Sequence, residues 1–265
     1  MNARNNIWST SYVSQWLLPL IPLIIWAIER FFNLDIIWFR TINQVTSSLP
    51  DLLWTGLSIL GNGWGCFALA FPLILFAPRL LMAGILSGIF TGIFSRVAKL
   101  IADTPRPAGL LDPNSFHIID QPLLHSALPS GHTMTVFGIA CAFYYCSTKK
   151  YRRYLKWLFV LAIGTGVSRI AVGAHWPEDV LVGSSLGFIS GIWAATLAKL
   201  IPEHYLKLNQ WPAVTTYVGS AVCFYVLITQ TLDFVINQPI QWILAGIIAI
   251  TWIKLISLVK YNQYV

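Results

Sequence analysis

The sequence predicts an all-α protein whose helices form a bundle that crosses a membrane several times. Composition and the length of the apolar runs lead to this fold class. Hydrophobic residues make up 56% of the 265 residues and charged residues 10%, against roughly 25% charged in an ordinary soluble domain. The apolar residues gather in long runs, and a spanning helix needs about 20 of them. Soluble, disordered and disulfide-stapled secreted proteins are therefore excluded.

Eight apolar runs predict eight spanning helices. The second run contains Gly61-Asn62-Gly63, which leaves the start of its helix open. Residues 33–49 mix apolar and charged side chains and predict an amphipathic helix along the membrane surface. Residues 1–15 are polar, and the first apolar run lacks a small-residue cleavage site, so no cleavable signal peptide is expected. The runs lie at 12–28, 52–77, 80–101, 131–147, 154–173, 179–201, 213–231 and 240–259.

Basic residues predict the orientation of these helices. The connection between the fourth and fifth runs, residues 146–156, carries five Lys and Arg side chains and no acid. The positive-inside rule makes this side cytoplasmic, and alternation of the helices then places both termini and Arg4 there. Nine of the ten acids and the polar connection 102–130 fall on the outer side. The net charge of +7 is thus a topology signal and does not indicate a nucleic-acid partner.

Two sets of glycines recur at four-residue spacing, in 84–92 and in 183–191. Small residues at this spacing let helix backbones approach closely in a membrane. We therefore expect both sets to serve helix packing. The glycines are Gly84, Gly88, Gly92, Gly183, Gly187 and Gly191.

Polar residues gather at the outer ends of the third to sixth spans. An ionisable residue at a helix end within the membrane is costly and needs a reason. Because odd spans run outward and even spans run inward, these residues all fall at one depth. They are Lys99, Arg106 and Pro107; Pro129, Ser130, Gly131 and His132; Ser168 and Arg169; and His175 and Asp179.

Three cations in this set indicate an anion site. Lys99, Arg106 and Arg169 would repel one another without a counter-ion. A phosphate suits them, because guanidinium forks and an ammonium match its oxygens. Ser130 and Gly131 begin a helix, where free backbone N–H groups favour an anion and the missing side chain of glycine permits close approach.

The two histidines are expected to have separate roles. His175 and Asp179 lie four residues apart, on one face of a helix. A carboxylate on one ring nitrogen leaves the lone pair of the other nitrogen free to attack, which makes His175 a nucleophile. His132 can protonate the leaving oxygen as a general acid. No metal site or cofactor is expected, and the four cysteines, Cys66, Cys141, Cys146 and Cys223, are expected to be buried thiols.

The motifs K-x6-R-P, P-S-G-H and S-R-x5-H-x3-D, in this order, resemble the three signatures of the type 2 phosphatidic acid phosphatase superfamily, which includes membrane lipid phosphatases and vanadium haloperoxidases. The resemblance implies a six-helix phosphatase core over 1–201, with 202–265 as two additional C-terminal helices. It also implies a metal-independent reaction through a phosphohistidine at His175, with His132 as the acid. The phosphate would be held by Lys99, Arg106, Ser130, Gly131 and Arg169.

The expected function is that of an integral-membrane lipid phosphatase facing away from the cytoplasm. Its substrate would be a lipid such as undecaprenyl diphosphate, phosphatidate or phosphatidylglycerol phosphate. A phosphotransferase acting on another lipid, such as lipid A, stays open as an alternative. A non-catalytic lipid transporter is less favoured, and a haloperoxidase is disfavoured because those enzymes are soluble. Headgroup, chain, oligomeric state and protein partners are not specified by the sequence.

Other polar residues are given structural interpretations. His117, His125 and His204 are expected to be solvated loop residues, although His125 could touch the substrate headgroup. Arg96 is expected to pair with Asp103 or Asp51. Trp176 is expected to be an interfacial anchor that also shapes the site.

Overall fold

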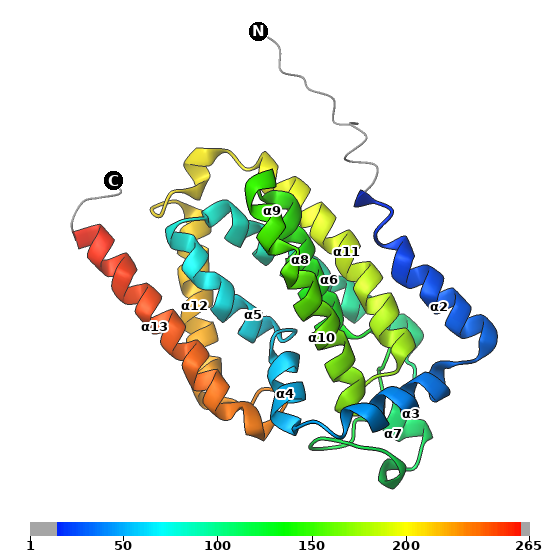
Figure 1. The fold of residues 1–265 in the computed structure, drawn as a ribbon. Helices are drawn as coiled ribbons and strands as arrows, with labels where there is room; N and C mark the ends of the chain where they lie inside the picture. Colours follow the sequence, from blue (N-terminus) through cyan, green and yellow to red (C-terminus); the bar gives the residue numbers. More distant parts are fainter. Residues whose placement is uncertain (1–14, 261–265) are drawn as a thin grey trace.

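The computed structural model describes residues 15–260, which form helices joined by loops with no strand among them (Figure 1). The predicted all-α fold class is confirmed. The start of the first apolar run, Arg4 and both ends of the chain lie outside the described residues, so the predictions about them stay predictions.

The helices of the N-terminal part lead from the first apolar run to the third. They are α2 (Leu20–Phe32), α3 (Asp35–Thr46), α4 (Asp51–Ile59), α5 (Gly63–Ala70), the 3-10 helix η1 (Phe71–Leu75) and α6 (Pro78–Ala102).

The remaining helices carry the other motifs and the C-terminal spans. They are α7 (Pro107–Leu110), η2 (Pro113–Ser115), α8 (Gly131–Cys146), α9 (Lys149–Leu155), α10 (Trp157–Ala171), α11 (Pro177–Leu200), η3 (Glu203–Leu206), α12 (Trp211–Thr229), η4 (Val235–Asn237) and α13 (Gln238–Lys260).

The chain is a multi-pass membrane protein, but the predicted count of eight spans is not confirmed. Within the described part, five helices are long and apolar enough to cross a membrane, and a sixth span is possible if α4 and the α5–η1 segment count as one helix bent by 70°. The helices α2 and α8 fall short, with 13 and 16 residues. A short α8 is tolerated because it packs against α6, α10 and α11 in the bundle interior, so its ends need not reach the lipid surface.

The two glycine sets behave differently. On α11 the predicted close packing is confirmed, because a Cβ at Gly183 would lie 2.8 Å from the carbonyl oxygen of Ser130 and one at Gly187 would lie 2.6 Å from that of Met134. On α6 the prediction is wrong for Gly88 and Gly92, where an added Cβ would meet no described atom within 4 Å. Gly84 and Gly88 border an open groove, and only Gly84 is also closely packed, since a Cβ there would lie 2.9 Å from the ring of Phe143.

The predicted amphipathic segment forms the helix α3, which crosses one end of the bundle near α7 (Figure 1). Its position along a membrane surface stays a prediction. The buried amide of Asn43 holds α3 in place. It donates to the carbonyl oxygen of His117 at 2.9 Å and to that of Ile170 at 3.1 Å. The basic helix α9 lies at the opposite end of the bundle (Figure 1). These contacts fix α3 over the ends of the motif-bearing helices.

Candidate active site

The ends of α6, α8, α10 and α11 bring the three motifs together. Between α10 and α11 the chain reverses at Gly173, whose φ of +74° is left-handed and favours glycine. A Cβ there would also lie 2.7 Å from the carbonyl oxygen of His117. After this turn, the backbone N–H of His175 donates to the carbonyl oxygen of Arg169 at 3.1 Å. The turn therefore places the third motif's histidine directly beside its arginine.

His175 and Asp179 form the predicted pair. Nδ1 of His175 lies 3.1 Å from Oδ2 of Asp179, and the two side chains are 2% and 0% exposed. The same Oδ2 accepts the backbone N–H of Trp176 at 2.8 Å. A carboxylate held in this way fixes the Nδ1–H tautomer and leaves the lone pair on Nε2. Nε2 lies 3.4 Å from Nη1 of Arg106, so the free nitrogen faces a cation.

Backbone carbonyls hold Arg106 in place. Its Nε donates to the carbonyl oxygen of His125 at 2.8 Å, and its Nη1 donates to that of Ala174 at 3.0 Å. Its Nη2 makes a longer bond, 3.4 Å, to the carbonyl oxygen of Ser126. The carbonyls orient the guanidinium without neutralising it, so its positive charge stays available to an anion.

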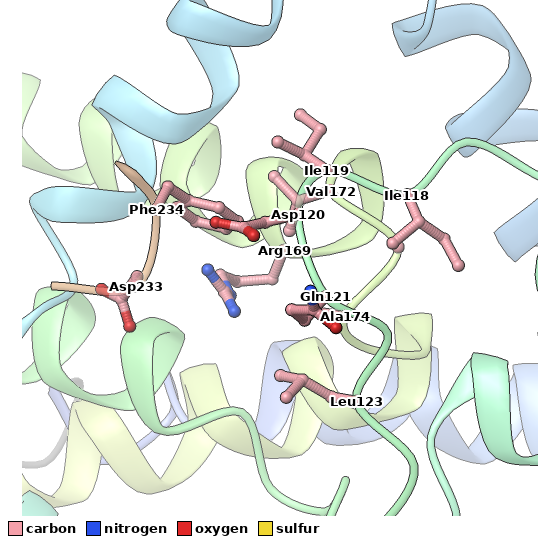
Figure 2. A pocket seen from close by; sticks show the side chains of 11 residues that line it. Ile118, Ile119, Asp120, Gln121, Leu123, Arg169, Val172, Ala174, Asp233 and Phe234 are labelled. Atoms are coloured by element: carbon pink, nitrogen blue, oxygen red, sulfur yellow. The ribbon is translucent and has the colours of Figure 1, made fainter. Parts of the chain in front are cut away.

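Arg169 is almost fully buried at the end of α10. Its Nη1 donates to the hydroxyl of Ser58, and its guanidinium lies over the ring of Phe234, 5.7 Å from the centroid. Its buried Nε has no partner among the described residues. Figure 2 shows the guanidinium pointing toward Asp233 in a pocket of about 290 Å³. An unpartnered buried donor of this kind suits an anionic ligand.

Lys99 lies in the last turn of α6, in the same cluster. The charges of Arg106, Asp179 and Arg169 all act on its ammonium. The charges of Arg106, Arg169, Lys99 and His132 likewise act on the imidazole of His175. The structure thus brings together the cations and histidines that the sequence predicted would meet.

The start of α8 differs in one detail from expectation. The backbone N–H of Ser130 is not free, because it donates to the carbonyl oxygen of Asp179 at 3.0 Å. The Ser130 hydroxyl oxygen accepts from the hydroxyl of Thr133 at 2.9 Å and caps the helix. The N–H groups of Gly131 and His132 in the first turn have no carbonyl partner within the helix. They, and the hydrogen of the Ser130 hydroxyl, are the donors left for an anion.

His132 has a partner that sequence reasoning missed. Its Nε2 lies 3.0 Å from Oδ2 of Asp233, in the connection between α12 and α13. Asn62 also donates to this oxygen at 2.8 Å, while its own side-chain oxygen caps α5. The sequence shows Asp233 only as one acid of the outer face and Asn62 only as part of a helix break. Neither pattern signals a contact with His132.

Gly61, in the break between α4 and α5, lies in close contact with His132. A Cβ at Gly61 would lie 2.7 Å from both Cβ and the carbonyl oxygen of His132. Real Cβ atoms essentially never come so close to backbone, so a side chain at this position would displace His132. The glycine in this interruption of the second apolar run therefore lets the backbone lie directly against His132.

The minor interpretations can now be compared with the structure. Trp176 is buried and donates from Nε1 to the carbonyl oxygen of Pro105 at 2.9 Å, so it ties the first motif to the third instead of anchoring an interface. His117 is half-buried and paired with Asp51 at 2.9 Å, so it is not a solvated loop residue. Arg96 forms no salt bridge with Asp51 or Asp103 in the part of the chain that the structure describes. The side chain of His125 is exposed, as expected for a loop residue. The four cysteines are free thiols, of which Cys141 and Cys223 are buried as expected and Cys66 and Cys146 are only half-buried.

Fold and site together define a class: a multi-pass helical membrane protein with a histidine–aspartate pair among fixed cations at the ends of four helices. The family model described as PAP2 superfamily matches residues 66–203, which is more than half of the 265 residues. The chain therefore belongs to the PAP2 superfamily. All three motifs lie inside the matched residues, whereas Gly61, Asn62 and Asp233 lie outside them.

Particular relatives share only parts of the chain. Lipid A 1-phosphatase of Porphyromonas gingivalis is 34% identical over 83 residues, which are 30% of this chain and 19% of that protein. The chain thus spans about a fifth of the length of this curated relative.

Two crystal structures are similar to this one. LpxE of Aquifex aeolicus has a TM-score of 0.54 and 30% identity, over 62% of this chain and 95% of that one. The PAP2-type phosphatidylglycerolphosphate phosphatase of Bacillus subtilis shares the fold, with a TM-score of 0.50 and 20% identity over 72% and 97% of the two chains.

Proposed function

We propose that the chain is an integral-membrane lipid phosphatase that hydrolyses a phosphomonoester or a pyrophosphate on a lipid through a phosphohistidine. One observation carries the proposal: His175, paired with Asp179, is buried among Lys99, Arg106 and Arg169 at the ends of membrane helices. Fixed cations suit a phosphate, and a neutral imidazole beside them suits attack on phosphorus. Membership of the PAP2 superfamily supports this assignment.

The proposed reaction has two steps. The lone pair of His175 Nε2 attacks phosphorus, the bond from phosphorus to the leaving oxygen breaks, and His132 gives that oxygen a proton. In the second step His132 takes a proton from water, the water oxygen attacks the phosphohistidine, and inorganic phosphate leaves. Such transfers depend mainly on positioning and charge stabilisation. These would come from Lys99, Arg106 and Arg169, with Ser130 and Gly131.

The electrostatics of His175 support its role as nucleophile. Burial lowers the pKa of His175 well below its ordinary value of 6.5, and the charges of Arg106, Arg169, Lys99 and His132 lower it further. A group with a lowered pKa stays unprotonated until the pH falls through that lowered value. His175 is thus neutral at neutral pH, and any loss of activity from its protonation begins well below pH 6.5.

An apolar groove supports a lipid as the substrate. The groove has a volume of about 590 Å³ between α5, α6, α8 and α12, and Phe67, Gly88 and Ile139 are among the residues that line it. Asn62, which bonds Asp233 beside His132, also lines it. In a phosphomonoester, the oxygen that His132 would protonate is the one attached to the lipid. A hydrocarbon chain leading from that oxygen would meet the groove.

The position of the basic residues supports a site facing away from the cytoplasm. The basic helix α9 lies at the end of the bundle opposite α3 and α7, and α3 lies over the motif-bearing helix ends (Figure 1). Under the positive-inside rule the end with α9 is cytoplasmic. The substrate headgroup would then lie at the outer surface of the cell membrane.

Phosphate release by the purified protein tests the proposal. We expect release from long-chain lipid phosphates in detergent micelles, weaker release from short-chain analogues, and full activity in EDTA because fixed cations would take the place of a divalent ion. Loss of activity in EDTA that Mg²⁺ or Zn²⁺ restores would contradict metal independence. Transfer of labelled phosphate to an added acceptor lipid, with none to water, would instead identify a phosphotransferase.

Gly61→Ala is expected to lower phosphate release by up to about a hundredfold, because a displacement of about 1 Å in a catalytic group has an effect of this size. The added methyl group would push His132 away from the leaving oxygen. The measurement is the initial rate of phosphate release, together with the unfolding temperature.

Gly63→Ala is the matched control, since a Cβ there would meet no described atom within 4 Å. It should keep the activity of the unchanged protein. Equal activity in both variants would mean that His132 does not depend on its contact with the α4–α5 break.

A further inference from the structure

The connection between α12 and α13 reaches the site from a part of the chain that carries none of the three motifs. Oδ2 of Asp233 contacts Nε2 of His132 at 3.0 Å, and their side chains are 22% and 19% exposed. We propose that Asp233 is a positioning residue that favours the protonated form of His132 and holds its ring aligned to donate to the leaving oxygen. The proposal rests on the function proposed above and gives the C-terminal helices a part in the reaction.

Buried amides hold this connection in one conformation. Gln241 in α13 is fully buried; its Oε1 accepts the backbone N–H of Leu232 at 3.1 Å, and its Nε2 donates to the carbonyl oxygen of Gln230 at 2.8 Å. Asn237, also fully buried, donates to the carbonyl oxygen of Thr55 at 2.8 Å. Buried amides are costly unless they are bonded. Here their bonds fix the backbone on both sides of Asp233.

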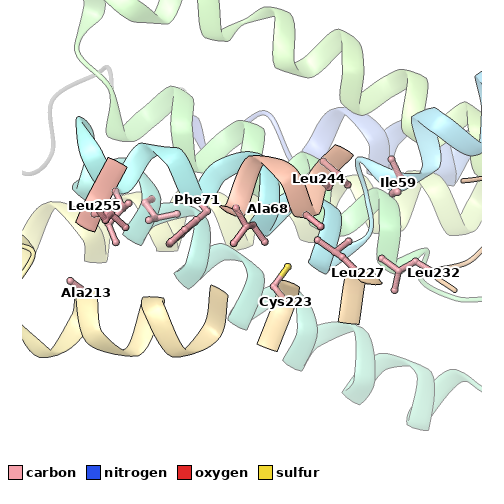
Figure 3. Close-up of a cluster of buried hydrophobic side chains, with 13 residues drawn as sticks. Ile59, Ala68, Phe71, Ala213, Cys223, Leu227, Leu232, Leu244 and Leu255 are labelled. Carbon is pink, nitrogen blue, oxygen red and sulfur yellow. The ribbon is translucent and has the colours of Figure 1, made fainter. Parts of the chain in front are cut away.

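Packing attaches the C-terminal helices to the region of the break. A cluster of buried side chains joins α5 and η1 to α12 and α13 (Figure 3). Phe71, Cys223, Leu227 and Ile248 belong to it, and each is at most 1% exposed. At Asp233 itself φ is 50°, in the left-handed region that Asp adopts more readily than most residues. The carboxylate is thus carried on a packed and bonded support.

The charges around His132 give the contact its effect. Asp233, Arg169 and Lys99 face it from three different elements, and His175 lies in the same cluster. Burial and the two cations disfavour a positive imidazolium at His132, and the carboxylate of Asp233 favours it. Burial raises the pKa of Asp233, but the charge and hydrogen bond of His132 and the charge of Arg169 together bring that pKa well below its usual range. Asp233 is therefore ionised at neutral pH.

Asp233→Asn tests the proposal, because it removes the charge and keeps the size of the side chain. A general acid must be protonated, so kcat/KM falls as rising pH removes its proton. Loss of the Asp233 charge should move this fall to lower pH by about one unit, which is the smallest pKa shift usually caused by a nearby opposite charge. In the alkaline range kcat should fall about tenfold relative to the unchanged protein, because the same shift leaves less of His132 protonated. KM should change by no more than about twofold. Asp233→Glu should restore part of the activity.

Asp51→Asn is the matched control. It removes the carboxylate of another histidine pair on the same face, Asp51 with His117 at 2.9 Å, and should leave the pH profile unchanged. If Asp233 only stabilised the connection, Asp233→Asn would lower the unfolding temperature and leave the profile in place. If the carboxylate merely blocked the phosphate site, activity would rise. Either result would overturn the proposal.

A readout without substrate separates this inference from the proposed function. The chain has five histidines, so their imidazole resonances can be followed by NMR in histidine-labelled protein in micelles, with His132→Gln to assign the peak. Asp233→Asn should lower the titration midpoint of His132 by about one unit, and Asp51→Asn should leave that midpoint in place. An unmoved midpoint overturns the proposal, whereas absence of phosphate release from every lipid overturns the function alone.

Discussion

Replacing His175 by alanine is expected to reduce phosphate release by at least about a thousandfold, because the variant loses the nitrogen that would form the phosphohistidine. The buried Asp179 would then lack its imidazole partner, and no other described side chain contacts its Oδ2 carboxylate oxygen. The measurements are steady-state phosphate release and labelling of the protein by a ³²P-labelled lipid phosphate. An alkaline quench preserves a phosphohistidine.

The control is His204→Ala, at an exposed histidine of η3 remote from the motifs. It should retain both activity and labelling. Labelling that persists in His175→Ala would identify a different nucleophile. Activity without any labelled protein, in the unchanged enzyme, would indicate direct attack by water.

Replacing His132 by alanine is expected to slow release from an alkyl lipid phosphate by about 10²- to 10⁴-fold, the usual contribution of a general acid. An alkoxide leaves poorly without a proton, whereas a nitrophenolate is stable without one. The first turnover with nitrophenyl phosphate should therefore be nearly unaffected, and later turnovers should be slow because His132 also activates water. Single-turnover release of nitrophenolate measures the first step alone.

His117→Ala is the control here, since His117 also pairs with an aspartate but lies in the loop bonded to α3. It should behave like the unchanged protein with both substrates. Equal losses on lipid and aryl phosphates in His132→Ala would contradict the acid role and favour a part in binding.

The sequence predicted the fold class and most of the cluster because both depend on local patterns. Apolar runs report burial in lipid, and motif residues at the ends of successive antiparallel helices must share a membrane face. Lys99, Arg106, Arg169, His132 and His175 accordingly lie in one electrostatic cluster. The count of spans was harder to predict, because a helix in the interior of the bundle, such as α8, can be shorter than one that faces lipid.

By itself the sequence determined that this is a helical membrane protein, and it predicted a phosphate-binding site made from three motifs. Only the tertiary structure decided that Gly61 lies under His132 and that Asp233, 101 residues further along the chain, bonds the same histidine. It also decided that the N–H of Ser130 is taken by Asp179 and that Gly88 borders a groove instead of a helix. The physical reason is that such contacts depend on how helices far apart in the chain pack. A glycine or an aspartate carries no local pattern that names its neighbour.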